Sequence, residues 1–500
     1  MNLKPRFVAL LVTVAVLVGA AGSYIGIQYF GNDQNSVSQS KQIANADQDT
    51  KNFGSLSEKE QEEFLQNIGN TDLKKVEQAY SVIKDNYVKE IDQNKLVEGA
   101  IQGMLDTLDD PYSVYMDKDT MKQFNQTIES SFEGIGAEVS MVDDKVTIVA
   151  PIKGSPAEKA GLKPNDQILK VDGKSVEGMD LYDAVLKIRG KKGSEVTLEI
   201  DRPGTGDPLN IDITRDDIPL DTVYSDTKTV DGKKVGVIEI TTFSENTSDE
   251  FKKALTKLEK DGMDGLVIDV RGNPGGLLQD VQEILKQFIP KDQPLVQVED
   301  RNGEKSPYYS DLKEKKDYPI NVLMDEGSAS AAEILASAMN EAGGYDLVGT
   351  KSFGKGTVQQ AIPMGDGSTI KLTLFKWLTP DGNWIHKKGI QPTVKVKQPD
   401  YFYTNPVEIK DTLTYDETGD KVKNLQKMLK GLGYDPGRTD GYFSKETVAA
   451  VKEFQQDEGL KATGDIDEKT GGKIEEKIVT EVRDDKNDLQ MKKALDVLFK

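Results

Sequence analysis

Apolar residues recur along the chain with spacings that change from one region to the next. Between residues 57 and 116 they return every three or four positions, as at Val76, Tyr80 and Ile83, which predicts amphipathic helices. Residues 132–215 contain short β-branched runs at 146–149, 167–171 and 196–200, with helical stretches at 155–161 and 180–188. This second pattern predicts a small β-rich unit with two helices.

Strand-like and helix-like segments alternate through residues 216–400. The strand-like runs lie at 235–240, 266–270, 295–298, 322–324 and 370–375, and the helical runs at 248–260, 277–288 and 331–341. This order predicts a layered α/β domain.

The C-terminal part of the chain reads as helical again. One apolar face in residues 415–475 is formed by Val422, Leu425, Met428 and Leu429, and another by Val448, Val451 and Phe454. These residues predict a small separate helical unit. The charged stretch at 481–500 carries spaced leucines, so we expect a helix that packs on another part of the protein or on another chain.

The N-terminal segment has the features of a membrane anchor. Lys4 and Arg6 precede an apolar run from residue 7 to 30 that contains no charge and spans roughly 36 Å as a helix. We therefore predict an anchor at residues 1–30, with the N-terminus in the cytoplasm and the body outside. We favour it over a cleaved signal peptide, for which small residues at 20–23 offer a site, and over a buried soluble helix.

Residues 31–56 are polar and without periodicity, so they are expected to form a flexible linker. Either form of the N-terminal segment makes this an exported protein, held at the cell membrane or, alternatively, secreted or associated with the cell wall.

Charge and composition narrow the chemistry. The chain has 85 acidic and 64 basic residues, a net charge of −21, which argues against nucleic acid as a partner. It has no cysteine and one histidine, His386. These counts exclude a thiol nucleophile, disulfides, a thiolate zinc site and a multi-histidine metal site. A Ser-His-Asp triad would need His386.

A first candidate motif is GSASAAE at residues 327–333, which follows an expected strand and opens a helix. A serine there exposes its hydroxyl, and the next N–H, on Ala331, is an unpaired donor of the first helical turn. This is half of an oxyanion hole. The alternative is an ordinary serine helix cap.

A second candidate is GTKSFGKGTVQQ at residues 349–360. It departs from a phosphate-binding loop because Gly356 stands where Ser or Thr must hold Mg²⁺. An S-x-x-K reading requires a helix, which its glycines disfavour. Lysine is the known substitute for histidine as the base of a serine hydrolase. Lys355 can serve when burial lowers its pKa, with Gln359 on the same side to orient the amine.

A third candidate is DVRGNPGG at residues 269–276, between an expected strand and helix. Glycines at such a point let backbone N–H groups approach a ligand closely. The alternative is an ordinary strand–helix turn.

Together, SASAAE at 328–333 and GKGTVQ at 354–359 resemble the carboxyl-terminal processing (tail-specific) serine peptidases, over roughly residues 60–400. The resemblance implies Ser330 as nucleophile, Lys355 as general base and Gln359 as the residue that orients the lysine. It further implies oxyanion donors at Ala331 and at Gly275 or Gly276, with no metal or cofactor. Ala332 stands where many relatives have a third serine, which is not catalytic in the family.

Residues 132–215 resemble a PDZ domain. The match places its carboxylate-binding loop at Gly134, Ile135, Gly136 and Ala137, where N–H groups hold a chain's C-terminal carboxylate. In this family such a domain selects substrates by their C-terminal tails. We hypothesise that Arg189 couples the occupied PDZ domain to the catalytic domain; the alternative is a solvated surface arginine.

Residues 415–475 resemble a three-helix peptidoglycan-binding domain. The fold class expected is therefore multidomain α+β. It comprises an anchor (1–30), a linker (31–56), N-terminal helices (57–131), an inserted PDZ domain (132–215), an α/β peptidase core (216–400), the three-helix domain (415–475) and a C-terminal helix (481–500).

The expected function is a serine endopeptidase that cleaves exported or membrane proteins chosen by their tails. Peptidoglycan and a second copy of the chain, in a homodimer, are further partners to consider, besides the membrane. The alternatives are a non-catalytic, cell-wall-associated PDZ scaffold and a cell-wall amidase or transpeptidase. The lack of cysteine and zinc ligands disfavours the last.

Overall fold

The computed structural model describes residues 73–128, 131–142, 145–152, 154–179, 181–202, 208–404, 407, 409 and 411–500. The predicted anchor and linker, at 1–30 and 31–56, lie outside the described residues. Within the described part, no helix combines the length and hydropathy needed to cross a bilayer.

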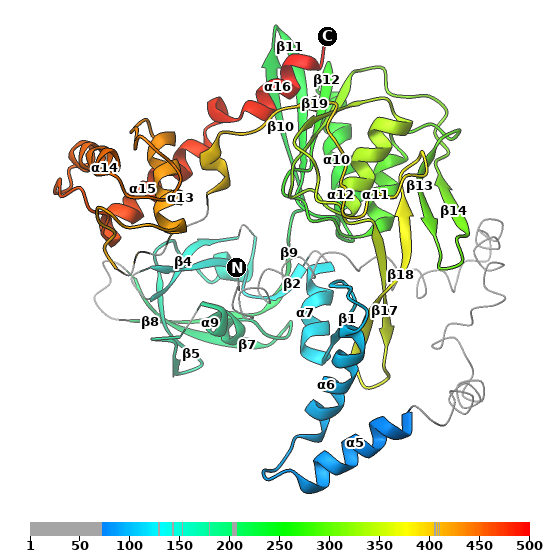
Figure 1. The fold of residues 1–500 in the computed structure, drawn as a ribbon, viewed down its shortest axis with the longest axis horizontal. Coiled ribbons are helices and arrows are strands. Elements are labelled where there is room, and N and C mark those ends of the chain that lie inside the picture. Colours follow the sequence, from blue (N-terminus) through cyan, green and yellow to red (C-terminus); the bar gives the residue numbers. More distant parts are fainter. Residues whose placement is uncertain are drawn as a thin grey trace.

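Helices form the N-terminal region, as the apolar spacing predicts. They are α5 (Leu73–Asn86), α6 (Gln93–Asp106) and α7 (Lys118–Ile128), with strand β1 (Val114–Met116) before α7. Asp92 caps α6 by accepting hydrogen bonds from the N–H groups of Asn94 and Lys95. Helices α5 and α6 project away from the rest of the molecule, and α5 buries none of its residues (Figure 1).

The PDZ unit is a sheet closed by two helices. Its strands are β3 (Ala137–Val142), β4 (Lys145–Pro151), β5 (Gln167–Val171), β6 (Lys174–Ser175), β7 (Glu195–Asp201) and β8 (Leu209–Thr214), in the order β3-β4-β5-β7-β8 with β6 beside β5. Helices α8 (Pro156–Lys159) and α9 (Leu181–Ile188) match the two predicted positions, although α8 is only one turn. The antiparallel pair β2 (Ser131–Gly134) and β9 (Asp216–Pro219) leads into and out of this unit.

A six-stranded sheet forms the centre of the peptidase core. Its strands are β10 (Val223–Val230), β11 (Lys233–Ile240), β12 (Gly265–Asp269), β15 (Ile320–Met324), β16 (Asp346–Gly349) and β19 (Val394–Lys395), in that spatial order. All neighbouring pairs except β10–β11 are parallel. The parallel strands β12 and β15 are buried throughout, which explains their continuous apolar runs.

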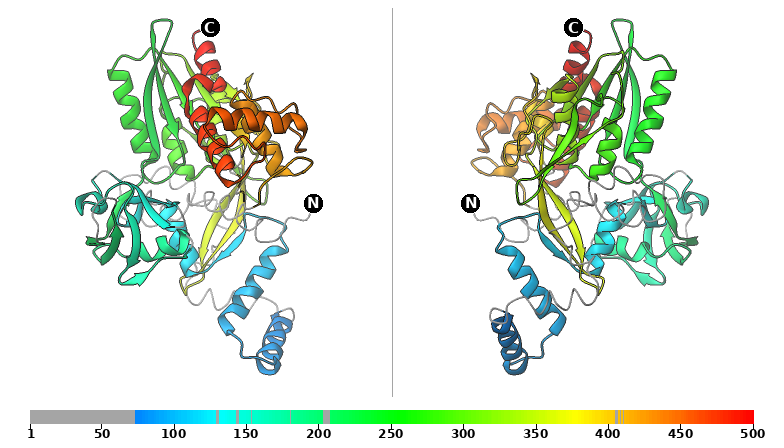
Figure 2. Two further views of the ribbon diagram at one scale, coloured as in Figure 1. Left: turned by 90° about the vertical axis from the view of Figure 1, so that its left-hand side faces the viewer. Right: turned by 90° about the vertical axis from the view of Figure 1, so that its right-hand side faces the viewer.

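Helices cover both faces of this sheet (Figure 2). On one face lie α10 (Thr247–Lys260), α11 (Leu278–Leu285) and α12 (Ala331–Ser337), whose apolar side chains join the largest core cluster. The predicted helix at 331–341 continues beyond Ser337 as a π-helix, η3 (Ala338–Ala342). The other face is covered by α16 (Leu489–Val497), through Met491, Ala494 and Leu498.

A second sheet extends the core toward the N-terminal region. It contains β13 (Pro294–Glu299), β14 (Lys305–Tyr309), β17 (Thr357–Pro363) and β18 (Thr369–Leu378), and β1 adds to the edge of β18. The long hairpin β17–β18 runs down beside α6 and α7 in Figure 1. Thus residues 114–116 pair with β18, the second strand of the hairpin that follows Lys355.

The C-terminal helical unit contains α13 (Asp420–Gly431), α14 (Lys445–Asp457) and α15 (Glu468–Arg483). Its core includes the predicted apolar positions Val422, Leu425, Val451 and Phe454. The short helices η4 (Asp400–Tyr403) and η5 (Asp485–Asn487) connect it to the core. Of the two packing partners expected for residues 481–500, the structure places the helix α16 on the chain's own central sheet.

Candidate active site

Ser330 lies at a turn between a strand and a helix. Strand β15 ends at Met324 and α12 begins at Ala331, so Ser330 is the residue that caps the helix. Its φ of 52° is unusual for a residue with a side chain, and it is 7% exposed. The hydroxyl of Ser328 is instead used structurally, donating to the Val270 carbonyl (2.7 Å) and accepting from the Asp325 N–H (3.0 Å).

Glu333 fastens the serine segment to the lysine segment. Its carboxylate accepts hydrogen bonds from the N–H of Ser330 (2.9 Å) and of Lys355 (2.8 Å). It also accepts from the N–H of Gly354 (2.7 Å) and the hydroxyl of Ser352 (2.5 Å). Burial raises the pKa of Glu333, whereas these four donors favour its charged form. One buried carboxylate therefore fixes the distance between two segments that are distant in sequence.

Aromatic side chains hold the Lys355 loop from the other side. The chain has two tryptophans. Trp377 donates its indole N–H to the Lys355 carbonyl (2.7 Å), and Trp384 donates to the Gly356 carbonyl (2.7 Å). The lone histidine, His386, accepts the Gly356 N–H (3.3 Å) and stacks on Trp384. His386 thus supports the lysine loop.

The amine of Lys355 is desolvated. Lys355 is 3% exposed, and its Nζ lies 4.7 Å from the centre of the Tyr112 ring, within range of a cation–π contact. Burial lowers the pKa of Lys355 to about 8, although the charges of Asp110 and Glu333 oppose this shift. Between these two described residues, no hydrogen bond joins Nζ of Lys355 to Oγ of Ser330.

Gln359 is buried, and its side-chain oxygen accepts no hydrogen bond from the described residues. Its Nε2 donates to the hydroxyl oxygens of Thr357 and Thr373, both at 3.0 Å. Its Oε1 is buried and has no hydrogen-bond partner among the described residues. Such an oxygen is costly unless a donor reaches it. Thr373 in turn donates its N–H to Ser113 (3.0 Å), so the N-terminal segment supports Gln359 too.

The glycine loop after β12 lies against Ser330. A Cβ on Gly275 would stand 2.7 Å from the Cβ of Ser330, and one on Gly276 would stand 2.0 Å from the Phe243 carbonyl oxygen. Both also have positive φ, 106° and 141°, so only glycine fits at either position. The Gly275 N–H donates to Oδ1 of Asn273 (2.8 Å). No acceptor in the described residues takes the N–H of Gly276 or of Ala331.

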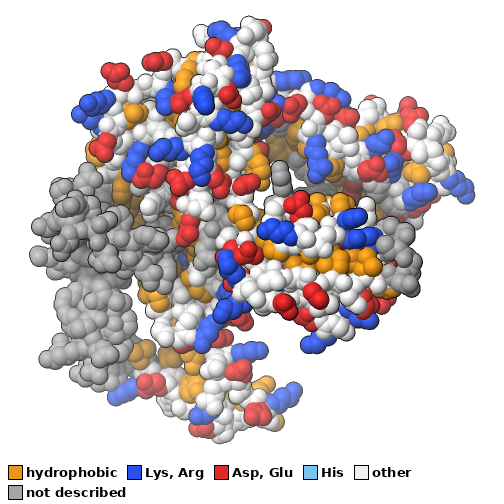
Figure 3. Space-filling model, turned by 180° about the vertical axis from the view of Figure 1, so that it is seen from behind, with side chains coloured by type: hydrophobic (Ala, Val, Ile, Leu, Met, Phe, Trp, Pro, Cys, Tyr) orange, Lys and Arg blue, Asp and Glu red, His pale blue; other side chains and the backbone are white. Residues whose placement is uncertain are grey.

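The predicted carboxylate-binding loop connects β2 to β3. Its carbonyls are engaged, because the Ile135 oxygen accepts from the Ala157 N–H (2.7 Å) and the Gly136 oxygen from the Ile152 N–H (2.9 Å). Across a trans peptide the carbonyl and the next N–H point in opposite directions. The N–H groups of Gly136 and Ala137 therefore point away from residues 152–157. Hydrophobic side chains also gather on this unit in Figure 3. Its exposed hydrophobic residues include Met141, Val149 and Leu186.

Arg189 lies just beyond α9. Its guanidinium carbon is 4.7 Å from the centre of the Phe132 ring on β2. Its side chain also lies beside Gly134, where an added Cβ would be 3.7 Å from the Arg189 Cγ. Arg189 therefore contacts the strand that joins the PDZ unit to the rest of the chain.

Several residues of this site do not follow from the sequence motifs. Glu333 had a local signal, because Ser followed three residues later by Glu is the pattern of a capping box. Tyr112 and the two tryptophans had none, since they reach the site only through tertiary packing, whereas Asn273 lies within the glycine motif at 269–276.

Four family models match the chain. Residues 234–396 match peptidase family S41, and residues 125–201 match the PDZ domain. Residues 16–120 match the N-terminal domain of the activating protease CtpB, and residues 418–474 match a peptidoglycan binding domain. The catalytic candidates Ser330, Lys355 and Gln359 all fall inside the first match.

Curated relatives match over most of their length. The carboxy-terminal processing protease CtpB of Bacillus subtilis is 54% identical over 99% of this chain and 100% of its own. The carboxy-terminal processing protease CtpA of the same organism is 47% identical over 86% of this chain and 91% of its own. The chain therefore belongs to peptidase family S41, among the carboxy-terminal processing proteases, and is a serine-type peptidase with a PDZ domain and a peptidoglycan-binding-type domain.

Proposed function

We propose that the chain is a serine endopeptidase whose catalytic dyad is Ser330 and Lys355. The observation that carries this proposal is that the Lys355 side chain is buried. The backbone N–H groups of Lys355 and Ser330 also donate to the same Glu333 carboxylate, which holds the two segments together. A lysine acts as a base only when it is neutral, and burial favours that form by lowering the pKa of Lys355 to about 8.

In the proposed reaction, the neutral Lys355 amine takes the proton of Ser330 as its oxygen attacks the peptide carbonyl. The unpaired Oε1 of Gln359 supports a further role, since it can accept a hydrogen bond from the ammonium that forms. The Lys355 ammonium then gives its proton to the leaving amine as the C–N bond breaks, which leaves an acyl-enzyme that water hydrolyses. Hydrogen bonds between catalytic groups are often long in the free enzyme and tighten with substrate.

The oxyanion formed during attack needs donors beside Ser330. The N–H groups of Ala331 and Gly276 are proposed for this role, because both are without an acceptor in the described residues. Gly275 contributes its lack of a side chain, which lets the loop approach Ser330. Each oxyanion donor is worth about 2.7–4 kcal/mol in comparable enzymes.

The pH profile of kcat/KM tests the base. Activity on an unstructured protein such as casein is expected to rise with pH through about 8, because only the neutral Lys355 accepts the serine proton. Two units below this pKa, about 1% of the amine is neutral, so kcat/KM should fall about a hundredfold from its plateau. A profile that stays flat from pH 6 to pH 9 would contradict the proposed base.

The PDZ domain is proposed to select substrates by their C-terminal tails. The loop at 134–137 presents backbone N–H groups for a terminal carboxylate, and an extended tail can add as a strand beside β3. The substrates proposed are exported or membrane proteins with accessible tails.

Arg189 is proposed to couple the occupied PDZ domain to the core, because it contacts Phe132 on the connecting strand β2. Replacement of Arg189 by Ala is expected to reduce the stimulation of casein cleavage by an added tail peptide severalfold. Affinity of the tail peptide, measured by fluorescence anisotropy, should stay within twofold. Unchanged basal and stimulated rates would identify Arg189 as a surface arginine instead.

Location and assembly are proposed from the sequence. The segment at 1–30 would anchor the chain in the cell membrane with the catalytic part outside; release as a secreted or wall-associated protein is the alternative. The C-terminal helical unit is proposed to contact peptidoglycan. A homodimer through terminal helices is proposed because α5 leaves Val76 and Ile83 exposed.

A non-catalytic PDZ scaffold is not favoured. A scaffold has no need of a buried lysine or of free N–H groups beside a strained serine.

A further inference from the structure

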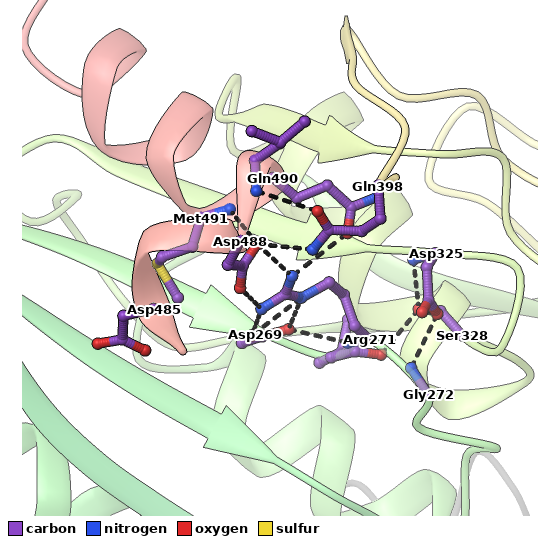
Figure 4. A network of polar contacts seen from close by, with 12 residues as sticks. Asp269, Arg271, Gly272, Asp325, Ser328, Gln398, Asp485, Asp488, Gln490 and Met491 are labelled. Atoms are coloured by element: carbon purple, nitrogen blue, oxygen red, sulfur yellow. Dashed lines mark hydrogen bonds and ion pairs between the residues drawn. The ribbon is translucent and has the colours of Figure 1, made fainter. Parts of the chain in front are cut away.

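Arg271 forms a largely buried ionic cluster just after β12 (Figure 4). Its Nε and Nη2 donate to the carboxylate of Asp269, with the shortest contact at 2.6 Å. Its Nη1 and Nη2 donate to the two oxygens of Asp488, at 3.0 and 2.9 Å. Nη1 also reaches Oε1 of Gln490 (3.3 Å). The guanidinium is thus held on two sides, once by its own strand and once by the C-terminal segment.

This cluster is more than a surface ion pair. The side chains of Arg271 and Asp488 are only 18% and 19% exposed. Burial alone would raise the pKa of Asp488, but the hydrogen bonds and charge of Arg271 lower it below its usual value. A bidentate pair of this kind fixes both the position and the orientation of the guanidinium.

The residues after Arg271 form the glycine loop of the site. The Gly272 N–H donates to Asp325 (2.8 Å), and the Asn273 carbonyl accepts from the Ala329 N–H (2.9 Å). These contacts tie the loop to the turn that carries Ser330. Arg271 is therefore the fixed point at the beginning of a short loop that ends with Gly276, a proposed oxyanion donor.

Asp488 also links the segment that enters the C-terminal helical unit, near residue 398, to the segment that leaves it, near residue 489. Gln398, on the incoming connection, donates to Asp488 (2.7 Å) and accepts from the Leu489 N–H (3.0 Å) on the outgoing one. Gln490 donates to the Val396 carbonyl (3.0 Å). Figure 4 shows these side chains converging on the guanidinium. Both ends of the C-terminal unit thus meet at the residue that anchors the glycine loop.

We propose that Asp488 is a positioning residue for catalysis, which acts through Arg271 to set the glycine loop beside Ser330. The C-terminal segment is then part of the catalytic core, and its contact with Arg271 controls kcat. This inference rests on the proposed function, because it assigns an oxyanion donor to the end of that loop. It gives a role to Arg271 and Asp488 that the Ser330/Lys355 chemistry does not use directly.

The test compares Asp488→Asn with wild type in the full chain. Asparagine keeps the size of the side chain and an acceptor for the Met491 N–H. It removes the negative charge, however, and so weakens the bidentate hydrogen bonding to Arg271. We expect kcat to fall about tenfold, since small misplacements of a catalytic group are costly, while KM changes less than twofold. Labelling of Ser330 by a fluorophosphonate, in which serine displaces fluoride at phosphorus while the phosphoryl oxygen uses the same oxyanion donors, should slow in parallel.

Asp485→Asn is the matched control. Asp485 lies in the same connection, but it is exposed and pairs with Lys228 on the surface. This variant should keep wild-type kcat, and both variants should bind a tail peptide with wild-type affinity. Arg271→Lys keeps the positive charge but loses the planar guanidinium donors that make the bidentate contact. It should reproduce the kcat defect of Asp488→Asn.

The outcomes separate the inference from the function on which it rests. A lower melting temperature in Asp488→Asn, with wild-type kcat and labelling rate well below that temperature, would reduce the cluster to a purely structural role. A wild-type protein that is neither labelled nor active would overturn the proposed function, and this inference with it. A kcat loss shared equally by Asp485→Asn would also overturn the inference.

Discussion

Replacement of Ser330 by Ala is expected to reduce peptide-bond cleavage by a factor on the order of 10⁴–10⁶, to the level left by the oxyanion donors alone. The reason is that Ser330 lies at the start of α12 beside the glycine loop, whereas the nearby Ser328 hydroxyl is used in a hydrogen bond to the Val270 carbonyl. Casein hydrolysis, with and without a tail peptide, measures this loss, and fluorophosphonate labelling should disappear with it.

Ser337→Ala is the matched control for this loss. Ser337 is a buried serine of the same helix, but its hydroxyl donates to the Ile334 carbonyl, one turn earlier. It should retain cleavage and labelling. Activity that persists in Ser330→Ala would refute the proposed nucleophile, whereas wild-type protein that resists labelling would favour the scaffold alternative.

Replacement of Lys355 by Met is the second change with a large expected effect. Methionine keeps most of the apolar volume of the lysine stem and leaves no buried charge unpaired on the side chain, so the fold should persist. Without a base, kcat/KM is expected to lie about 10⁴-fold or more below the wild-type plateau at every pH from 6 to 10, with no rise near pH 8.

A second buried lysine provides the control. Lys371, on β18, is fully buried, and burial together with the charge of Lys355 lowers its pKa to about 7. Lys371→Met should keep a measurable activity whose rise with pH remains. If Lys371→Met lost the pH dependence while Lys355→Met kept activity, the roles of the two lysines would have to be exchanged.

The sequence predicted the candidate residues better than their surroundings. The sequence pointed to Ser330 and Lys355 as candidates because the lack of cysteine and the single histidine leave a serine hydrolase few other bases, and their catalytic roles stay predictions. The helix and strand order of the core was also predictable, since buried parallel strands such as β12 and β15 have continuous apolar runs.

Other features depend on contacts that no local pattern encodes. Tyr112 lies more than two hundred positions before Lys355, and Asp488 more than two hundred positions after Arg271, so only the folded chain brings each pair together. The apolar spacing in α5 predicted a helix correctly but could not predict that the helix would remain exposed. The proposal of Gly276 rather than Gly275 as an oxyanion donor rests on the hydrogen bond from the Gly275 N–H to Asn273, which only the structure shows.

The Glu333 carboxylate has a consequence for control of this protease. Because it accepts hydrogen bonds from the N–H groups of Ser330, Gly354 and Lys355, we expect the backbones that carry the proposed nucleophile and base to move together. We therefore expect neither an inhibitor nor an activating signal to change activity by moving the Ser330 and Lys355 segments apart. Switching the enzyme on and off is therefore expected to operate on the walls around this rigid pair, namely the Tyr112 segment and the loop that ends at Gly276.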